Sequence, residues 1–214
     1  VKTKAGEEYH IVLDRTPFYA EMGGQVGDTG TISLGEGKPT IHIADTRKEN
    51  DLFVHISRDN NLDEALQGAT QTVTAKIDSQ RRAKITSNHS ATHLMLSAMR
   101  QVLGNHITQK GSYLNDEVLR FDFSHFAKVN DDELRQIEDI VNDKIRQNIA
   151  LDEKRNVPIQ QALELGATAT FGEKYGDFVR VITFEPGYST ELCGGTHVSS
   201  TGTIGLFKFT SEGS

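Results

Sequence analysis

The chain has 214 residues, of which 36% are hydrophobic and 25% charged, a composition typical of a soluble globular protein with one large or two small domains. The formal net charge of −7 argues against a protein that coats nucleic acid by bulk electrostatics, and no apolar run approaches the roughly 18 residues of a membrane span. The single cysteine excludes an internal disulfide and fits a reducing compartment, so we expect a cytoplasmic location and no membrane partner.

The first 77 residues are expected to form a β-rich unit, because short alternating runs are separated by glycine-containing turns. The predicted strands are residues 9–13, 40–44, 52–56 and 70–77. No helical pattern of useful length interrupts them. We therefore interpret residues 1–77 as a small, glycine-rich β-barrel.

Residues 78–214 mix helices and strands without regular alternation, which predicts an α+β core. The expected helices are residues 79–86, a second helix capped by Asn88 that runs from His89 to Leu103 before Gly104, a third from Asn130 to about Asn148, and a short one between Pro158 and Gly166. The expected strands are residues 118–123, 178–184 and 203–209. The chain begins with Val1 rather than methionine, which favours a fragment of a longer protein.

The densest basic run of the chain, Arg81-Arg82-Ala83-Lys84, precedes the second predicted helix. Either a local groove for nucleic acid or an ordinary solvated helix face explains such a run. The sequence leaves both interpretations open.

Two short patterns, far apart in the chain, carry metal-binding side chains. His89-Ser90-Ala91-Thr92-His93 places two imidazoles one turn apart on the same face of a helix. Cys193-Gly194-Gly195-Thr196-His197 places the one cysteine four residues before a histidine, around a glycine pair that permits a tight turn. Each pattern alone also fits ordinary core or surface residues.

Together the two patterns supply three imidazoles and one thiolate, a set that binds zinc well. Four protein ligands would close a structural site, whereas three ligands and a water would leave a position for chemistry. A protease of the H-E-x-x-H type would need a glutamate where this chain has Ser90, so that mechanism is not supported.

Several motifs of the chain resemble those of the alanyl-tRNA synthetase editing domain, in order and over essentially its whole length. The two metal patterns match within Asn88–Leu94 and Glu191–His197. The other matching segments are Thr16–Gly30, Arg100–Gly104, Gln109–Ser112, Leu119–Phe123 and Phe171–Gly176. One departure is Met22, where the family often has serine, and little effect on the metal site is expected.

The resemblance implies an editing hydrolase that deacylates alanine-specific tRNA wrongly charged with serine or glycine. It implies a zinc ion held by His89, His93, Cys193 and His197, the aminoacylated 3′ end of tRNA as ligand, and the remainder of the synthetase as a partner if this is a fragment. It also implies a β-barrel at residues 1–77 and an editing core at residues 78–214.

Two polar residues, Gln109 and Thr92, are the candidate catalytic residues. Gln109 falls where the family has a polar pocket residue, and its amide can hydrogen-bond the amino or hydroxyl group of the substrate. Thr92 lies between the paired histidines, near the same pocket. An exposed loop glutamine and a helix-packing threonine are the ordinary alternatives for these two positions.

Two other functions compete with the editing hydrolase. One is a non-catalytic tRNA-binding module whose zinc is purely structural, and the other is a zinc hydrolase of an unrelated small ester. Gln109 and the glycine-rich segment favour the editing hydrolase, since a structural zinc site needs neither.

Overall fold

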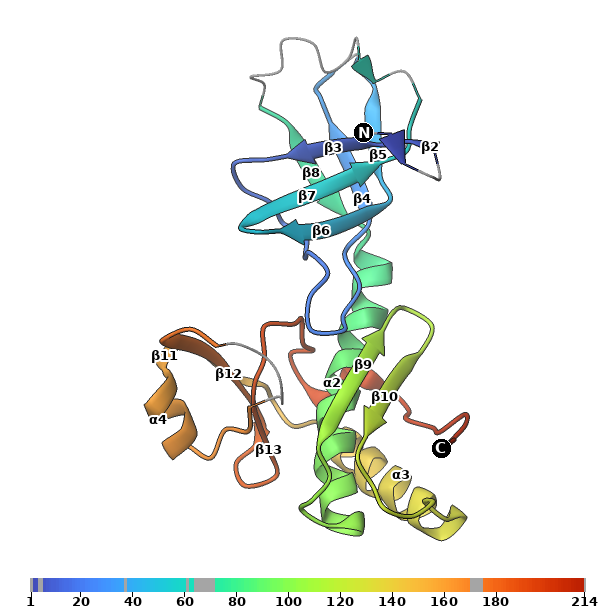
Figure 1. Cartoon of the computed structure of the whole chain (residues 1–214), viewed down its shortest axis with the longest axis vertical. Coiled ribbons are helices and arrows are strands. Elements are labelled where there is room, and N and C mark those ends of the chain that lie inside the picture. Colours follow the sequence, from blue (N-terminus) through green and yellow to red (C-terminus); the bar gives the residue numbers. More distant parts are fainter. Residues whose placement is uncertain are drawn as a thin grey trace. The chain divides into compact units, whose positions relative to one another are not determined.

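The structure is a computed structural model that describes residues 2–3, 6–36, 38–60, 62–63, 72–169 and 175–213. The chain divides into two compact units, residues 1–84 and 85–214, and the division falls inside the long helix α2 (Ser79–Leu103) (Figure 1). None of the described helices is long and apolar enough to span a membrane. The assignment of residues 1–77 and 78–214 to two functional domains stays a prediction.

The first unit is built from short antiparallel strands. In chain order they are β1 (Lys2–Thr3), β2 (Gly6–Glu7), β3 (Tyr9–Val12), β4 (Gly30–Ser33), β5 (Thr40–Ile43), β6 (Asp45–Glu49), β7 (Leu52–Ser57) and β8 (Thr74–Ile77). The predicted strands at residues 9–13, 40–44 and 52–56 are confirmed, and residues 70 and 71 of the fourth lie outside the described part. Pattern reasoning missed the two-residue strands β1 and β2, and it missed β4 and β6 because their sequences are rich in glycine, threonine and charged residues.

These strands form two three-stranded sheets, ordered β3-β7-β6 and β5-β4-β8. Ala44 separates β5 from β6, and its amide donates to the Ile56 carbonyl at 2.8 Å. Closure into a barrel would require the edge strands β3 and β8 to pair, but each pairs with only one neighbour among the described strands. The predicted closed barrel is therefore not found in this part of the chain.

The core of the first unit lies against the inward faces of these sheets. Strand β5 alternates between exposed and buried residues, as a strand with one buried face should. The buried cluster contains Phe18, Ile32, Leu34, Ile41, Ile43 and Leu62.

The glycine-rich segment Thr16–Gly30 packs within this unit. A Cβ atom on Gly27 would lie 2.0 Å from the Thr46 carbonyl oxygen, so only glycine fits there. Asp28 is 1% exposed and accepts from the Tyr19 amide at 2.7 Å. These contacts give the segment a packing role inside the first unit.

Two arginines of the basic run also hold the first unit together. Arg82 Nε donates to Asp28 Oδ1 at 2.8 Å, and Arg81 Nη1 donates to the Gly27 carbonyl at 2.8 Å. Asp78 caps the helix that carries both, accepting from the Gln80 and Arg81 amides. The run is therefore not simply a row of solvated cations.

Helix α2 is continuous from Ser79 to Leu103, so the two predicted helices are one. Asn88 is not a cap, since it lies inside the helix and its Nδ2 donates to the Asn115 carbonyl at 2.8 Å. Asp78 instead provides the start of the helix, and Gly104, with a φ of 114°, ends it as expected.

The rest of the second unit mixes short sheets and helices, which confirms the α+β class. The elements are β9 (Gln109–Leu114), β10 (Leu119–Phe123), α3 (Asp131–Arg146), β11 (Asp152–Pro158), α4 (Ile159–Glu164), β12 (Phe178–Glu185), β13 (Ser189–Leu192) and a 3₁₀ helix η1 (Thr201–Ile204). Strands β9 and β10 form a hairpin, and β11-β12-β13 form an antiparallel sheet. Sequence reasoning found β10, α3, α4 and β12, and it missed β9, β11 and β13.

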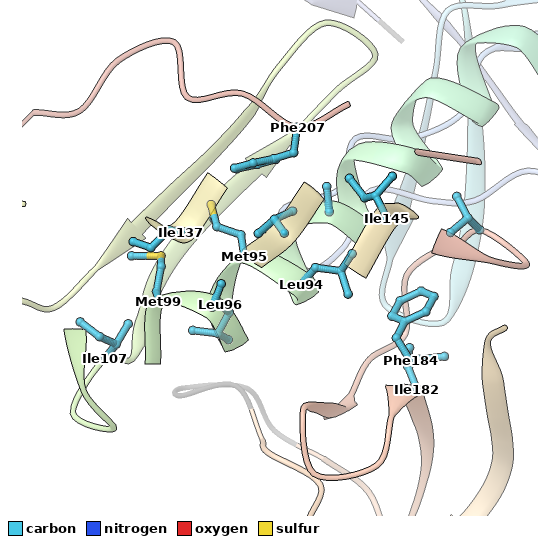
Figure 2. Close-up of a cluster of buried hydrophobic side chains, with 14 residues drawn as sticks. Leu94, Met95, Leu96, Met99, Ile107, Ile137, Ile145, Ile182, Phe184 and Phe207 are labelled. Atoms are coloured by element: carbon cyan, nitrogen blue, oxygen red, sulfur yellow. The ribbon is translucent and has the colours of Figure 1, made fainter. Parts of the chain in front are cut away.

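Side chains of α2, α3 and β12 form the core of the second unit. Figure 2 shows Leu94 and Met95 of α2 close to Ile137 and Ile145 of α3 and to Phe184 of β12. The predicted capping box of α3 is present: the Asn130 side chain accepts from the Glu133 amide, and the Glu133 side chain accepts from the Asn130 amide.

The predicted strand at residues 203–209 is wrong. The 3₁₀ helix η1 covers its start, and Gly205 then adopts a φ of 86°. Side chains of α3 take the place of a neighbouring strand: Asn142 bonds both the amide and the carbonyl of Phe207, and Glu138 accepts from the Phe209 amide. The backbone is thus satisfied without a sheet, which the alternating sequence does not reveal.

Candidate metal centre

The two metal patterns meet in the second unit. The ligand atoms of His89, His93, Cys193 and His197 all lie within 4.8 Å of one another. Cys193 Sγ lies 3.3 Å from His89 Nε2 and 3.3 Å from His197 Nε2. Residues about 100 positions apart in sequence thus present nitrogen and sulfur atoms to one point.

Local structure explains this convergence. Helix α2 places His89 and His93 one turn apart, with ring centroids 5.3 Å apart, and the two residues are 6% and 9% exposed. Cys193 directly follows β13, and the Gly194-Gly195 turn brings His197 back to within 4.6 Å of the His89 ring centroid.

Protein groups hold the outer nitrogens of two of the imidazoles. His93 Nδ1 lies 2.7 Å from Glu191 Oε2, which also accepts from Ser189 Oγ at 2.9 Å. A carboxylate accepts and does not donate, so Nδ1 carries the proton and Nε2 is left for a metal. His197 Nδ1 similarly lies 3.2 Å from Ser90 Oγ, which also accepts from the Val198 amide.

The electrostatics of the cluster suit a cation. Burial raises the pKa of Cys193, but the neighbouring His89 and His93 outweigh this and hold it well below its usual value. Burial lowers the pKa of His93, yet Glu191 and Cys193 raise it to about 10. Burial also lowers the pKa of His197, to about 3. Zinc binds a thiolate and neutral imidazoles, so Cys193 and His197 already carry the required charge, whereas zinc would have to displace the extra proton that His93 holds.

The residues present therefore fit zinc, with four donors of the right type and protein partners on the outer nitrogens of His93 and His197. Sequence reasoning named the four residues that the structure brings together, but it missed the partners of their outer nitrogens, Glu191 and Ser90. The available signals were a glutamate placed two residues before Cys193 in a strand and a serine directly after His89. Glu191 is only 5% exposed, and a carboxylate is rarely buried unless it is paired, as this one is with His93.

The two candidate catalytic residues lie in the same unit. Thr92 is 6% exposed, and its hydroxyl donates to the Asn88 carbonyl at 2.9 Å. Gln109 begins β9 and is half-buried, with Nε2 donating to Ser112 Oγ at 3.1 Å. None of the hydrogen bonds found in the described residues joins either side chain to the four ligand groups. Their catalytic roles stay predictions.

Glu191 also borders a pocket of about 290 Å³. Polar side chains of the C-terminal half of α2 and of the β13 strand line much of it, among them Ser97, Arg100, Gln101 and Thr190. Glu191, whose carboxylate bonds His93, thus also lines a cavity with polar walls.

Comparison with known proteins places this centre in a family. Residues 1–81 match the model for class II (A) tRNA synthetases, and residues 179–214 match the second additional domain of threonyl and alanyl tRNA synthetases. Over all 214 residues the chain is 56% identical to an alanine–tRNA ligase of Cytophaga hutchinsonii, 55% to one of Bacteroides fragilis and 52% to one of Salinibacter ruber. The chain belongs to the alanine–tRNA ligase family.

The chain spans about a quarter of the length of these relatives, 24% for the first two and 21% for the third. The match to the second additional domain contains Cys193 and His197, and the matched residues begin within β12. The candidate metal centre thus combines a loop within the matched region with two histidines of α2. The family resemblance seen in the sequence is confirmed, although Phe171–Lys174 of the last matching segment lie outside the described residues.

Proposed function

We propose that this chain is an editing hydrolase that removes serine or glycine from mischarged alanine-specific tRNA. The observation that carries the proposal is the convergence of three imidazoles and one thiolate, with supported outer nitrogens, in a chain of the alanine–tRNA ligase family. The ligand is the aminoacylated 3′ end of tRNA. In the reaction, water adds to the ester carbonyl, the bond to the ribose oxygen breaks, and the free amino acid and the tRNA hydroxyl are released.

The protein residues of this site would bind and orient the ester. When bound, zinc would supply a fixed positive charge held by His89, His93, Cys193 and His197. Gln109 retains an amide oxygen and a second N–H for the substrate, because only one N–H is used by Ser112. Thr92 donates its proton to Asn88 and can still accept a hydrogen bond.

Specificity must come from polar contacts. The site has to accept serine and glycine yet spare alanine, and glycine is smaller than alanine. Discrimination by a methyl group alone contributes only about 1–3 kcal/mol. We therefore assign recognition of the serine hydroxyl to Thr92 or Gln109.

A second function, tRNA binding with a purely structural zinc, is favoured by one observation. Four protein groups close together would fill a tetrahedral site and leave no position for water. An activity measurement separates the two functions, because a binding module does not accelerate deacylation.

The test is deacylation of Ser-tRNA and Ala-tRNA by the 214-residue chain, at protein concentrations high enough to offset weak tRNA capture. We expect the serine ester to be hydrolysed at least about tenfold faster than the alanine ester, as one well-placed polar contact provides. The double variant Thr92→Val with Gln109→Ala should reduce this ratio. Equal rates for the two esters, or a rate no greater than in buffer, would refute the proposal.

A further inference from the structure

The loop that carries Cys193 and His197 is held from behind by Arg180. Within the loop, the Gly195 amide donates to Cys193 Sγ at 3.4 Å. The carbonyl of Cys193 lies 3.3 Å from Arg180 Nη1, and the same nitrogen contacts the carbonyl of Gly195. One guanidinium thus binds the carbonyl groups on either side of the Gly194–Gly195 peptide, whose N–H faces the sulfur.

Neighbouring strands fix the position of this guanidinium. Arg180 lies on β12, and its side chain is 22% exposed. Arg180 Nε donates to Glu153 Oε1 of β11 at 2.9 Å, and Arg155 contacts the same oxygen. The hydrogen bonds from Arg180 and Arg155 outweigh burial and lower the pKa of Glu153 to about 2, so this carboxylate stays ionised. The arginine is therefore anchored on one side and bound to the loop on the other.

We propose that Arg180 is a positioning residue that sets the geometry of the Cys193 ligand. This inference rests on the proposed metal centre. By fixing the peptides 193–194 and 195–196, Arg180 also fixes the peptide between them, which directs its N–H to the sulfur. A planar guanidinium suits this task, because it presents several donors in fixed directions and stays charged.

The two ends of the loop depend on different groups. At the His197 end, Ser90 Oγ accepts from the Val198 amide, and Thr86 and Thr196 share a hydrogen bond of 2.9 Å. At the Cys193 end, the Cys193 amide donates to the Arg180 carbonyl at 3.1 Å, a backbone contact that any residue at position 180 retains. Loss of the Arg180 side chain should therefore loosen the sulfur ligand while the pairing of β12 with β13 persists.

Arg155 provides a matched control, because it contacts the same Glu153 oxygen but is 74% exposed and does not bond the loop carbonyls. The experiment measures Zn²⁺ affinity by chelator competition, and Co²⁺ absorption as a report on thiolate ligation, for Arg180→Ala, Arg180→Lys, Arg155→Ala and Arg155→Lys. Arg180→Ala should weaken Zn²⁺ binding about 10–100-fold and reduce the sulfur-to-cobalt absorption. The Zn²⁺ affinity of Arg180→Lys should lie between those of the wild type and Arg180→Ala, because an ammonium lacks the planar fork of a guanidinium. The Zn²⁺ affinities of both Arg155 variants should stay within about twofold of the wild-type value.

The melting temperature of the metal-free proteins shows whether the fold is kept. If Arg180→Ala fails to fold, the comparison of Arg180→Lys with Arg155→Lys decides, with at least a threefold difference in Zn²⁺ affinity expected. Equal Zn²⁺ affinity and equal cobalt spectra for the Arg180 and Arg155 variants would overturn the inference. A wild-type protein that binds neither metal would instead refute the metal centre itself.

Discussion

Both units of this protein bury histidines, but they use them in opposite ways. In the first unit His55 is fully buried, with Nδ1 2.9 Å from the Ile11 carbonyl and Nε2 2.7 Å from Thr16 Oγ1. Both of its nitrogens bond the protein. In the second unit His93 and His197 each bond a supporting side chain through Nδ1. Their candidate ligand atoms lie within 4.8 Å of those of the other two residues of the cluster.

The difference shows how a structural histidine can be told from a ligand histidine. A carbonyl accepts only, so Ile11 fixes the proton on Nδ1 of His55, and Thr16 then occupies Nε2. Nothing remains for a metal. At His93 the carboxylate of Glu191 fixes the proton in the same way, yet Nε2 is left for a ligand. What separates the two roles is therefore the partner of Nε2, which is a hydroxyl outside the cluster for His55 but another candidate ligand, Cys193 Sγ, for His197.

The sharpest test of this comparison replaces one histidine in each unit. His93→Ala should reduce zinc from about one ion per chain to nearly none and abolish deacylation, because a four-ligand site loses a ligand. His55→Ala should keep the zinc and lower the free energy of unfolding by about 2–4 kcal/mol, because it leaves a cavity and two unpaired polar groups. Metal analysis and denaturant titration measure both effects. Zinc loss in His55→Ala, or full zinc retention in His93→Ala, would contradict the comparison.

A smaller change tests the support of the ligand rather than the ligand. Glu191→Gln keeps a similar shape and an oxygen that can accept from His93, but it removes the charge. Zinc affinity should fall about 10-fold, the lower end of the effect of such outer partners. Ser189→Ala serves as the control, since it removes only the hydroxyl that donates to Glu191. Chelator competition gives the affinities, and a Glu191→Gln protein no weaker than Ser189→Ala would argue against this support.

Gln109 tests whether catalysis separates from metal binding. Its side chain bonds Ser112 and none of the four ligands in the described structure, so Gln109→Ala should keep the zinc. Its stability should change by less than about 0.5 kcal/mol, as for other partly exposed polar residues. Deacylation of Ser-tRNA should fall about 10-fold, the loss expected for one positioning contact. A wild-type rate would remove Gln109 from the proposed pocket.

Much of the site was predictable from the sequence because its ligands follow local rules. Spacing on a helix brings His89 to His93, and a glycine turn brings Cys193 to His197. That the two pairs meet was only a hypothesis, since it depends on tertiary packing. The supporting roles of Glu191 and Arg180 were not predicted for the same reason. Glu191 bonds a residue 98 positions away along the chain, and Arg180 bonds residues 13 and 15 positions away.

The fold was predictable to a similar degree. The capping box at Asn130 and the stop at Gly104 are local signals, and both are confirmed. The strand at residues 203–209 and the cap at Asn88 were wrong because long-range partners satisfy those segments: Asn142 and Glu138 bond the first, and Asn115 bonds the second. Barrel closure depended on the pairing of distant edge strands, which no short pattern specifies.

The smallest expected effect concerns the pH response of the first unit. Burial lowers the pKa of His55 below its ordinary 6.5, and the hydrogen bond to Ile11 offsets this only in part. Above pH 6.5 the folded and unfolded states are both neutral at this residue, so it adds no pH dependence. Below that pH the unfolded chain gains a proton that the folded ring resists, so the free energy of unfolding should fall until the folded pKa is passed.

Hydrogen exchange of the β3 and β7 amides at pH 7.5 and 5.5 measures this response in the first unit alone. His55→Gln provides the matched variant, since an amide can donate and accept but does not titrate. Between these two pH values the wild-type amides should lose more protection than those of the variant, after correction for the intrinsic exchange rates. Equal losses in the two proteins would mean that His55 does not titrate differently in the folded and unfolded states. That result would contradict the lowered pKa of the buried ring.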